Sequence, residues 1–336
     1  MSQGLKVAVV GATGMVGAEM LRVLEQRAFP VRELVPVASA RSAGKTVTFK
    51  GAEHTVVEIA PEVFEGVDLA LFSAGGATSR HWAPIAASKG ALVVDNSSAF
   101  RADPEVPLIV PEVNPDAAAD RPKGIIANPN CSTIQMVVAL KPLHDEARLK
   151  RVVVATYQAI SGAGAQAVAA FEAQETATSH AKPVEKDKLS GQLSRNLLMH
   201  WKPDPNTGYQ EEELKMVSET RKIFGDPSIA VSPTAVRVPV VTAHSEAVTV
   251  ETHAPLTAAR ARELLEKAEG VVVVDDLSEG RYPQPIDAAG QDPVYVGRIR
   301  DDVGNPGGIQ MWVVSDNLRK GAALNAVQIA EKVLIK

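Results

Sequence analysis

Residues 5–17, LKVAVVGATGMVG, carry the strongest fold signal in the chain. The apolar run LKVAVV predicts a buried strand, and residues 15–27 have the spacing of an amphipathic helix. Between them, Gly11 permits a sharp turn, Gly14 lets backbone N–H groups approach a pyrophosphate, and Gly17 permits close packing of the helix on the strand. A strand, a glycine-rich turn and a helix in this order predict a dinucleotide-binding unit, and the alternative is a purely structural turn.

The pattern around this stretch predicts the architecture of the first third of the chain. Short β-branched runs at 33–38, 69–73 and 91–94 alternate with helical patterns, which is typical of a mainly parallel sheet. Residues 46–57, TVTFKGAEHTVV, contain two alternating runs joined by a Lys-Gly step and predict an inserted hairpin.

The second half of the chain has a different texture. From residue 151 onward the strands are longer and alternating, with few crossover helices among them, which predicts a mixed or antiparallel sheet. Residues 176–205 are polar and contain proline, as expected of a long surface excursion, such as an arm to a partner subunit. A chain of 336 residues usually forms two domains, so we predict an α/β protein with a Rossmann-like N-terminal domain and an α+β domain with a mixed sheet.

Composition excludes several classes of function. Hydrophobic residues make up 45% and charged residues 22%, and no apolar run approaches the roughly 20 residues needed to span a bilayer. Lys and Arg number 35 against 40 Asp and Glu, without a basic block, so we expect no nucleic-acid partner and no membrane partner. The same lack of a basic block favours a small-molecule ligand. The first residues do not resemble a secretory signal, which favours a cytoplasmic location.

The end of the predicted second strand indicates which nicotinamide cofactor would bind. NAD-specific sites usually have an acid there to hold the ribose 2′-OH, but residues 37–44, VASARSAG, contain none. Arg41 and Ser42 offer a guanidinium and a hydroxyl that suit a 2′-phosphate, so we predict NADP. The alternative is that Arg41 is an exposed turn residue.

The chain has one cysteine, Cys131, in the sequence NPNCST between an apolar strand and an apolar helical run. A thiol at the start of a helix lies near the positive end of the helix dipole, where N–H groups lower its pKa and can hold an oxyanion. This position favours a nucleophile over the alternative of a buried, inert thiol.

These and further segments together resemble the aspartate-β-semialdehyde dehydrogenase family, which is related to the phosphorylating aldehyde dehydrogenases. The resemblance covers essentially the whole chain. The segments that carry it, in order, are VAVVGATGMVG, DNSSAFR, PEVN, NPNCST, ATYQAISGAG, EEELKMVSET, VRVPVVTAHSEAV and GAALNAVQIAE. It implies an NADP-binding domain at 1–130 with 316–336, and a catalytic and dimerisation domain at 131–315.

The resemblance also implies roles for individual residues. Cys131 is similar to the nucleophile that becomes an acyl-thioester, Gln158 to the residue that orients substrate and thioacyl group, and His244 to the general acid/base. Arg237 is similar to the arginine that grips the substrate α-carboxylate, and Glu212 to the ligand of its amino group.

The remaining implied positions bind phosphate or cofactor. Arg101 and Lys215 resemble the phosphate ligands. The residues that correspond to cofactor positions are Gly11, Thr13, Gly14, Met15, Val16, Arg41, Ser42, Ser161, Gly162 and Asn317. The resemblance assigns no residue to a metal.

For some of these residues a purely structural role stays open as an alternative. Glu212 and Lys215 are three apart in a helical pattern, so they could form only a solvated ion pair. Arg237 and His244 are seven apart, which on an uninterrupted strand places them on opposite faces, so the chain must bend near Pro239 or at the Thr-Ala step before His244. Arg237 could otherwise pair internally with Glu246.

The implied activity is the reversible, NADPH-dependent reductive dephosphorylation of L-aspartyl-4-phosphate to L-aspartate-4-semialdehyde through a cysteine thioester. This step belongs to the biosynthesis of lysine, diaminopimelate, threonine, methionine and isoleucine. The resemblance further implies inorganic phosphate as a ligand and a homodimer or dimer of dimers. The alternatives are an N-acetyl-γ-glutamyl-phosphate reductase, whose cysteine motif is typically NPGCYPT, and a catalytically silent cofactor-binding relative.

Overall fold

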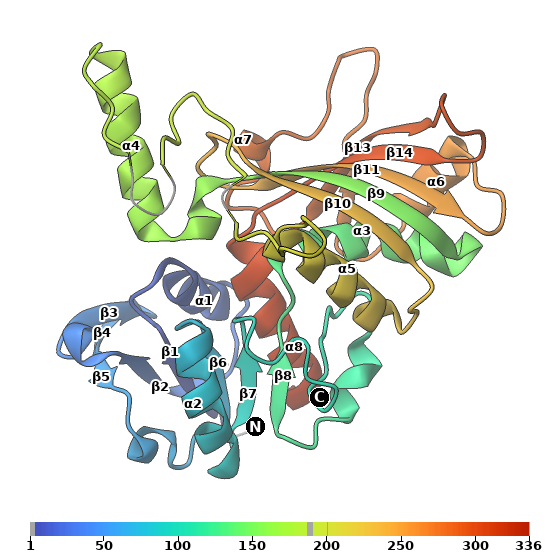
Figure 1. Cartoon of the computed structure of the whole chain (residues 1–336). Coiled ribbons are helices and arrows are strands. Elements are labelled where there is room, and N and C mark those ends of the chain that lie inside the picture. Colours follow the sequence, from blue (N-terminus) through green and yellow to red (C-terminus); the bar gives the residue numbers. More distant parts are fainter. Residues whose placement is uncertain (1–3, 187–190, 200, 336) are drawn as a thin grey trace. The chain divides into compact units, whose positions relative to one another are not determined.

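The computed structural model describes residues 4–186, 191–199 and 201–335. The chain divides into two compact units, Met1–Asn130 with Ala322–Lys336 and Cys131–Gly321 (Figure 1). Each unit contains a six-stranded sheet.

The first unit is a parallel sheet with helices on its faces, as predicted. The strand order is β5-β2-β1-β6-β7-β8, and every neighbouring pair is parallel. The strands are β1 (Leu5–Val10), β2 (Val31–Ala38), β5 (Val57–Glu58), β6 (Leu69–Phe72), β7 (Leu92–Asp95) and β8 (Ile125–Ala127). The predicted hairpin is present as antiparallel β3 (Thr46–Phe49) and β4 (Ala52–Thr55).

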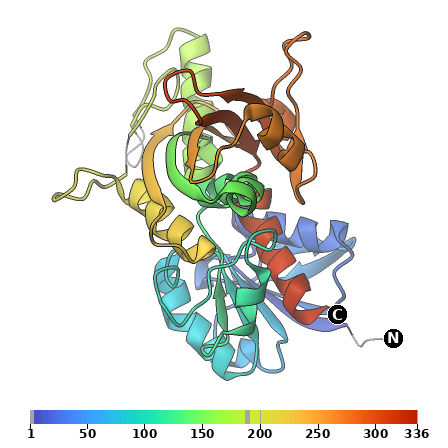
Figure 2. The ribbon, with the colours of Figure 1, turned by 90° about the vertical axis from the view of Figure 1, so that its right-hand side faces the viewer.

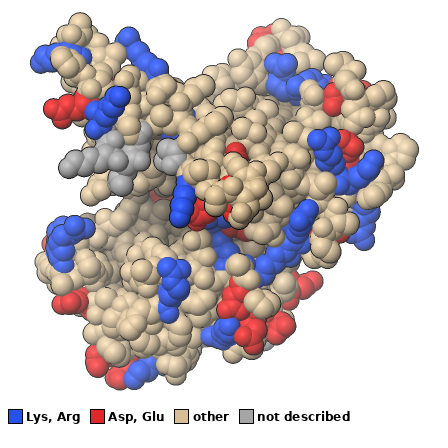
Figure 3. Space-filling model, viewed as in Figure 1, with Lys and Arg blue, Asp and Glu red and all other residues tan. Residues whose placement is uncertain are grey.

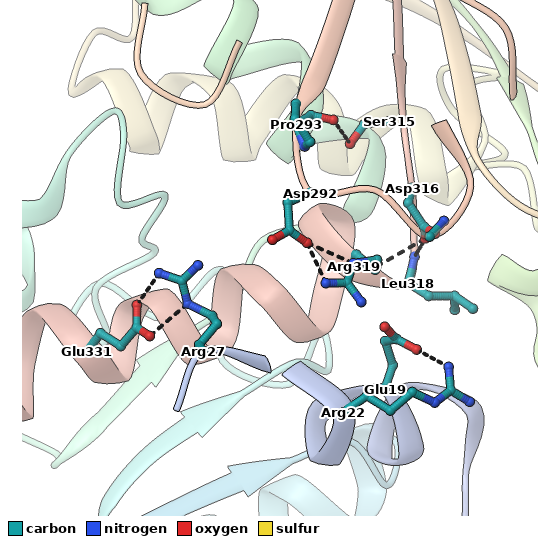
Figure 4. Close-up of polar contacts among 11 residues, drawn as sticks. Glu19, Arg22, Arg27, Asp292, Pro293, Ser315, Asp316, Leu318, Arg319 and Glu331 are labelled. Atoms are coloured by element: carbon teal, nitrogen blue, oxygen red, sulfur yellow. Dashed lines mark hydrogen bonds and ion pairs between the residues drawn. The ribbon is translucent and has the colours of Figure 1, made fainter. Parts of the chain in front are cut away.

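Three helices cover this sheet. They are α1 (Met15–Gln26), α2 (Gly76–Ser88) and α8 (Leu324–Leu334). Helices α1 and α8 share one apolar cluster with β1 and β6, whereas α2 packs on β6 and β7 (Figure 2). The bidentate pair between Arg27 and Glu331, with both N···O distances 2.7 Å, joins α1 to the end of α8 (Figure 4). The last helix of the chain therefore packs with the first unit, although it is far from that unit in sequence.

The second unit is built on the mixed sheet that the sequence predicts. Its order is β10-β9-β11-β14-β13-β12, with two parallel pairs, β9 with β10 and β12 with β13. The strands are β9 (Leu149–Gln158), β10 (Ala230–Arg237), β11 (His244–Thr252), β12 (Val271–Val273), β13 (Val294–Asp301) and β14 (Ile309–Ser315). The helices are α3 (Cys131–Ala147), α4 (Ala165–Ser179), α5 (Glu211–Phe224), α6 (Ala258–Leu265) and α7 (Pro285–Ala288).

The two faces of this second sheet differ. Helices α3, α5 and α6 pack on one face, so alternate residues of β9, such as Val152, Val154 and Thr156, are buried. The other face carries Tyr157, which is 38% exposed, and Trp312, with ring centroids 5.3 Å apart. The short helix α7 packs beside Trp312, whereas Tyr157 stays exposed, and exposed aromatic residues of this kind are typical of protein–protein interfaces.

Residues 316–321 group with the second unit, whereas the sequence analysis places them with the first. The Asp316 carboxylate accepts hydrogen bonds from the N–H groups of Gly290 (2.6 Å) and Leu318 (2.7 Å), and Arg319 Nε donates to Asp292 at 2.8 Å (Figure 4). These contacts hold the segment after β14 to the loop before β13.

The predicted excursion at 176–205 begins inside α4 and continues as irregular chain. Residues 187–190 and 200 of it lie outside the described residues. Among the described ones, Leu198 forms an antiparallel bridge with Arg237 of β10. The excursion therefore returns to the edge of the second sheet.

Candidate active site

The glycine turn of the first unit forms part of a cavity of about 280 Å³. Gly11 has a φ of +89°, and a Cβ there would lie 2.4 Å from the carbonyl oxygen of Ser73. A Cβ at Gly17 would lie 2.1 Å from the carbonyl oxygen of Gly11. Real Cβ atoms cannot approach so closely, so both glycines are required by the backbone path. At Gly11 and Gly14 the turn lines the cavity with backbone groups alone.

Several predicted cofactor residues line the same cavity. Arg41 and Ser42 follow β2 in a short 3₁₀ turn and share the cavity with Gly11, Thr13 and Gly14. Met15 and Val16 open α1 and do not line it. Sequence reasoning missed four further polar or aromatic lining residues, Ser39, Ser73, Thr78 and Trp82. Ser39 and Ser73 directly follow strands β2 and β6, whereas Thr78 and Trp82 lie within helix α2.

Arg101 lies in the loop after β7 and is held by backbone carbonyls. Its Nε donates to Asn128 O at 2.9 Å and its Nη2 donates to Asn96 O at 3.0 Å. Asn128 precedes Cys131 by three residues, so these bonds fix a guanidinium beside the chain segment that leads to the cysteine.

Cys131 is the first residue of α3, as predicted from NPNCST. Its exposure is intermediate, so it is not the fully buried, inert thiol that was the alternative to a nucleophile. A Cβ at Gly321 would lie 2.9 Å from Cys131 Cβ, which leaves no room for a side chain there. Gly321 belongs to a short π-helical turn, Arg319–Ala323, a distortion that is frequent at functional sites. Sequence reasoning did not find this glycine, because its contact with Cys131 is distant in sequence.

Arg237 and His244 lie side by side although they are seven residues apart. A Cβ at Gly162 would lie 3.1 Å from Arg237 Nη1 and 3.2 Å from His244 Cε1. Strand β10 ends at Arg237 and β11 begins at His244, and Ala243 between them has a φ of 75°. The chain therefore bends between the two strands, as the shared site requires.

The backbone of one residue, Ala159, orients both side chains. The N–H of Ala159 donates to His244 Nδ1 at 2.9 Å, and the Ala159 carbonyl accepts from Arg237 Nη1 at 2.6 Å. Because Nδ1 is an acceptor, the neutral imidazole carries its proton on Nε2. His244 Nε2 and Arg237 Nε have no hydrogen-bond partner among the described residues, so both donors are available to a ligand.

Burial sets the charge state of this pair. Burial, and then the neighbouring Arg237 charge, lower the pKa of His244 well below its ordinary value. Burial also lowers the pKa of Arg237, while the nearby groups Cys131 and Glu212 raise it. Neutral His244 beside a cationic Arg237 is therefore the state at neutral pH, and Cys131 lies within electrostatic reach of the guanidinium.

Glu212 is not simply one partner of a solvated ion pair. It is only 6% exposed, and its Oε1 lies 3.5 Å from Gln158 Nε2, which also approaches Thr156 Oγ1 at 3.3 Å. Lys215 Nζ lies 3.6 Å from Glu212 and 3.0 Å from Glu211. The i,i+3 pair exists, but the buried Glu212 also faces the end of β9.

Asn317 fixes two loops beside His244. Its Oδ1 accepts the N–H of Ala243 at 2.9 Å, and its Nδ2 donates to Ser161 Oγ at 2.9 Å. Ser161 and Gly162 belong to the short turn Ile160–Ala163 that follows β9. The structure thus brings Ser161, Gly162 and Asn317 together with His244, and their predicted contact with the cofactor stays a prediction.

Glu246 is not the partner of Arg237. It is fully buried two residues after His244, and neither carboxyl oxygen has a hydrogen-bond partner among the described residues. Burial raises the pKa of this carboxyl well above its ordinary value and so favours its neutral form. Because neither Glu246 oxygen is hydrogen-bonded to a donor among the described residues, an internal ion pair does not explain Arg237.

Other kinds of site find little support among the described residues. They contain no group of three or more His, Cys, Asp or Glu that could hold a metal ion, and no helix long and apolar enough to cross a membrane. Basic and acidic side chains are interspersed over the face shown in Figure 3, without one dominant basic field.

Comparison with known protein families agrees with this arrangement. Residues 6–121 match the semialdehyde dehydrogenase NAD binding domain, and residues 140–320 match the semialdehyde dehydrogenase dimerisation domain. The chain is thus a two-domain semialdehyde dehydrogenase, an oxidoreductase with a nicotinamide dinucleotide fold and a dimerisation domain.

Relatives narrow the class. Aspartate-semialdehyde dehydrogenase of Aquifex aeolicus is 55% identical, over 99% of this chain and 98% of its own, and that of Legionella pneumophila is 54% identical, over 98% and 96%. The structure of aspartate semialdehyde dehydrogenase II of Vibrio cholerae complexed with ASA has a TM-score of 0.96 and 49% identity, covering 99% of both chains. The chain belongs to the aspartate-semialdehyde dehydrogenase family.

Proposed function

We propose that this enzyme catalyses the reversible, NADPH-dependent reductive dephosphorylation of L-aspartyl-4-phosphate to L-aspartate-4-semialdehyde. The observation that carries the proposal is that the backbone N–H and carbonyl of Ala159 hold His244 and Arg237 side by side, within electrostatic reach of the helix-start residue Cys131. A nucleophile, a neutral donor and a carboxylate-binding fork are the parts that this reaction needs.

Cys131 is the acyl acceptor in this proposal. Its thiolate attacks the acyl carbon of the substrate, a C–S bond forms, the bond from that carbon to the phosphate oxygen breaks, and inorganic phosphate leaves. The first N–H groups of α3 and the nearby Arg237 charge favour the thiolate. Covalent catalysis divides a difficult displacement into easier steps.

The cofactor cavity of the first unit fits a nicotinamide dinucleotide with a 2′-phosphate. Gly11, Thr13 and Gly14 would hold the pyrophosphate at the start of α1, and Arg41 with Ser42 would hold the 2′-phosphate. When bound, NADPH supplies the hydride that reduces the thioester. A Candida albicans relative at 25% identity, with a TM-score of 0.76 over 98% of both chains, has been solved with NADP.

His244 acts as a hydrogen-bond donor through Nε2. The Ala159 N–H occupies Nδ1, so the neutral ring presents Nε2–H to the oxygen that becomes negative when the thioester is reduced. Collapse of this oxyanion re-forms the carbonyl, breaks the C–S bond and returns the thiolate, so the aldehyde leaves without a net proton requirement. Gln158 at the end of β9 orients the acyl group.

Opposite charges around the site match the ionic groups of the substrate. The Arg237 fork binds the α-carboxylate in a bidentate manner, and buried Glu212 binds the α-amino group. Arg101 and Lys215 bind the phosphate that leaves, or that enters in the reverse direction. Ser161, Gly162 and Asn317 complete the cofactor contacts.

The enzyme acts as a homodimer or a dimer of dimers built on the partly exposed face of the second sheet. Tyr157 and Trp312 lie on that face, inside the segment that matches a dimerisation domain. Light scattering should show a dimer or larger assembly for the wild type, and a monomer for Trp312→Glu. A monomeric wild type would contradict this part of the proposal.

The activity has a direct test. The enzyme should reduce NADP over many turnovers only when both L-aspartate-4-semialdehyde and inorganic phosphate are present. A preference for the N-acetyl-glutamate semialdehyde would assign the enzyme to the other reductase family, because an N-acetylated substrate has no amino group for Glu212 to bind. Cofactor binding without any turnover would indicate a catalytically silent relative.

A further inference from the structure

The excursion after α4 returns to the site at the end of β10. Leu198 N donates to Arg237 O at 3.0 Å, and Arg237 N donates to Leu198 O at 2.8 Å. These two bonds pair the excursion with the last residue of the strand. The Arg237 backbone is therefore held by β9 on one side and by the excursion on the other.

The same segment places an aromatic ring on the Arg237 side chain. The guanidinium carbon of Arg237 lies 4.8 Å from the ring centroid of Trp201, within the range of a cation–π contact. The edge of the guanidinium is held separately, because Nη1 donates to Ala159 O at 2.6 Å. Arg237 is 4% exposed, so its charge has lost most of its contact with water.

These contacts leave the guanidinium with a defined plane and an unused donor. Trp201 restrains rotation out of the plane, and the Ala159 carbonyl restrains rotation within it. Arg237 Nε has no hydrogen-bond partner among the described residues. A planar fork that is fixed before the ligand arrives loses less conformational freedom on binding a carboxylate.

We propose that Trp201 is a positioning residue that holds the Arg237 fork for the α-carboxylate of the substrate. The excursion thereby selects amino-acid aldehydes with a free α-carboxylate over aldehydes that lack one. The inference rests on the proposed function, because it assigns the carboxylate to Arg237. It gives the excursion a role in substrate selection in addition to any contact with a partner subunit.

Steady-state kinetics of the phosphorylating oxidation test this role. Trp201→Ala should raise KM for L-aspartate-4-semialdehyde about tenfold, the loss expected for a desolvated cation–π contact. KM for phosphate and for NADP should stay within about twofold, since neither ligand is bound by Arg237. Trp201→Phe keeps an aromatic face and should recover most of the loss.

A matched control and a second substrate separate positioning from general packing. Met199 belongs to the same segment and is 62% exposed, so Met199→Ala should behave like the wild type. The aldehyde of β-alanine has the amino group but no carboxylate. Its kcat/KM should be low in the wild type and unchanged by Trp201→Ala. In Arg237→Lys, removing Trp201 should cost much less than it does in the wild type.

Two results would overturn the proposal. One is an equal loss for both aldehydes, which would show that Trp201 supports the fold in general. The other is a Trp201→Ala enzyme with an unchanged KM for L-aspartate-4-semialdehyde. If the wild type does not oxidise L-aspartate-4-semialdehyde at all, the proposed function itself fails, and this result is distinct from both.

Discussion

The cofactor turn of the first unit and the catalytic cluster of the second unit use the chain in different ways. At the turn, backbone groups make the site, and Gly11 and Gly17 are required because a Cβ would strike backbone 2.4 and 2.1 Å away. In the cluster, side chains make the site, and the backbone N–H and carbonyl of Ala159 orient His244 and Arg237. The first region should therefore be damaged by added atoms, and the second by removed functional groups.

The largest effect should follow removal of the imidazole from the cluster. His244→Gln should lower kcat by about 10²–10³-fold, the usual loss when a donor to a developing oxyanion is removed. His253→Gln is the matched control, since His253 is exposed just beyond the end of β11, and it should leave kcat unchanged. A His244→Gln enzyme with normal kcat would remove the cluster from the chemistry.

The pH dependence of the wild type sharpens the same point. Burial and the Arg237 charge lower the pKa of His244 below the ordinary value of 6.5. The ring therefore stays neutral as the pH falls through 6.5, and kcat should fall only at more acidic pH. A titration step at or above pH 6.5 in the pH profile of kcat, if it disappears in His244→Gln, would contradict this account.

At the turn, one added methyl group should be the damaging change. Gly17→Ala should destabilise the protein by about 1–3 kcal/mol or more and weaken NADP binding, because the backbone of the turn must move. For stability, Gly14→Ala is the matched control, since a Cβ there would lie 3.3 Å from Gly11 O and needs only a small adjustment. Thermal melts of both variants measure the difference in stability, and fluorescence titration of Gly17→Ala against the wild type measures the loss of NADP binding. Equal behaviour of the two variants would mean that the backbone path tolerates a Cβ at Gly17.

A smaller and more selective effect is expected beside the turn. Arg41→Ala should weaken NADP binding by about 1.5–3 kcal/mol, the size of a charge-assisted hydrogen bond. NAD lacks the 2′-phosphate, so its affinity should hardly change. Calorimetric titration with both cofactors measures this. Equal losses for both would show that Arg41 supports the turn.

How much of each region the sequence predicts follows from the same difference. The turn is contiguous, so strand, glycines and helix could be inferred from residues 5–17, and the Cys131 helix start from NPNCST. The convergence of Arg237 with His244 depends on the pairing of β9, β10 and β11 and on the left-handed Ala243, which no local pattern encodes. Their roles could be predicted only through the family resemblance.

The contacts that the sequence could not predict are all non-local. Gly321 and Cys131 are the last and first residues of the second unit in sequence, yet they pack on each other. Trp201 contacts Arg237 from an irregular segment. Glu246 is an acid and could by residue type pair with Arg237. Only its burial, without a hydrogen-bond donor among the described residues, shows that it does not. Residue types alone do not distinguish these cases.

The smallest predicted effect concerns Glu246 and stability alone. In the unfolded chain this carboxyl ionises near 4.5, but in the folded protein it keeps its proton because burial raises its pKa. Glu246 therefore lowers the free energy of unfolding increasingly as the pH rises above 4.5. Glu246→Gln should raise Tm by a few degrees at pH 8 and by less at pH 5, with kcat within about twofold of wild type. A stability difference that does not depend on pH would show that the carboxyl is already ionised in the folded protein.

The central claim, that Cys131 carries the acyl group, can be tested by intact-protein mass spectrometry. The enzyme is mixed with L-aspartate-4-semialdehyde and NADP without phosphate, and then with phosphate. The account predicts one aspartyl group per chain on Cys131, its loss when phosphate is added, and neither adduct nor turnover in Cys131→Ala that still binds NADP. More than trace turnover in Cys131→Ala, or an adduct on another residue, would contradict it.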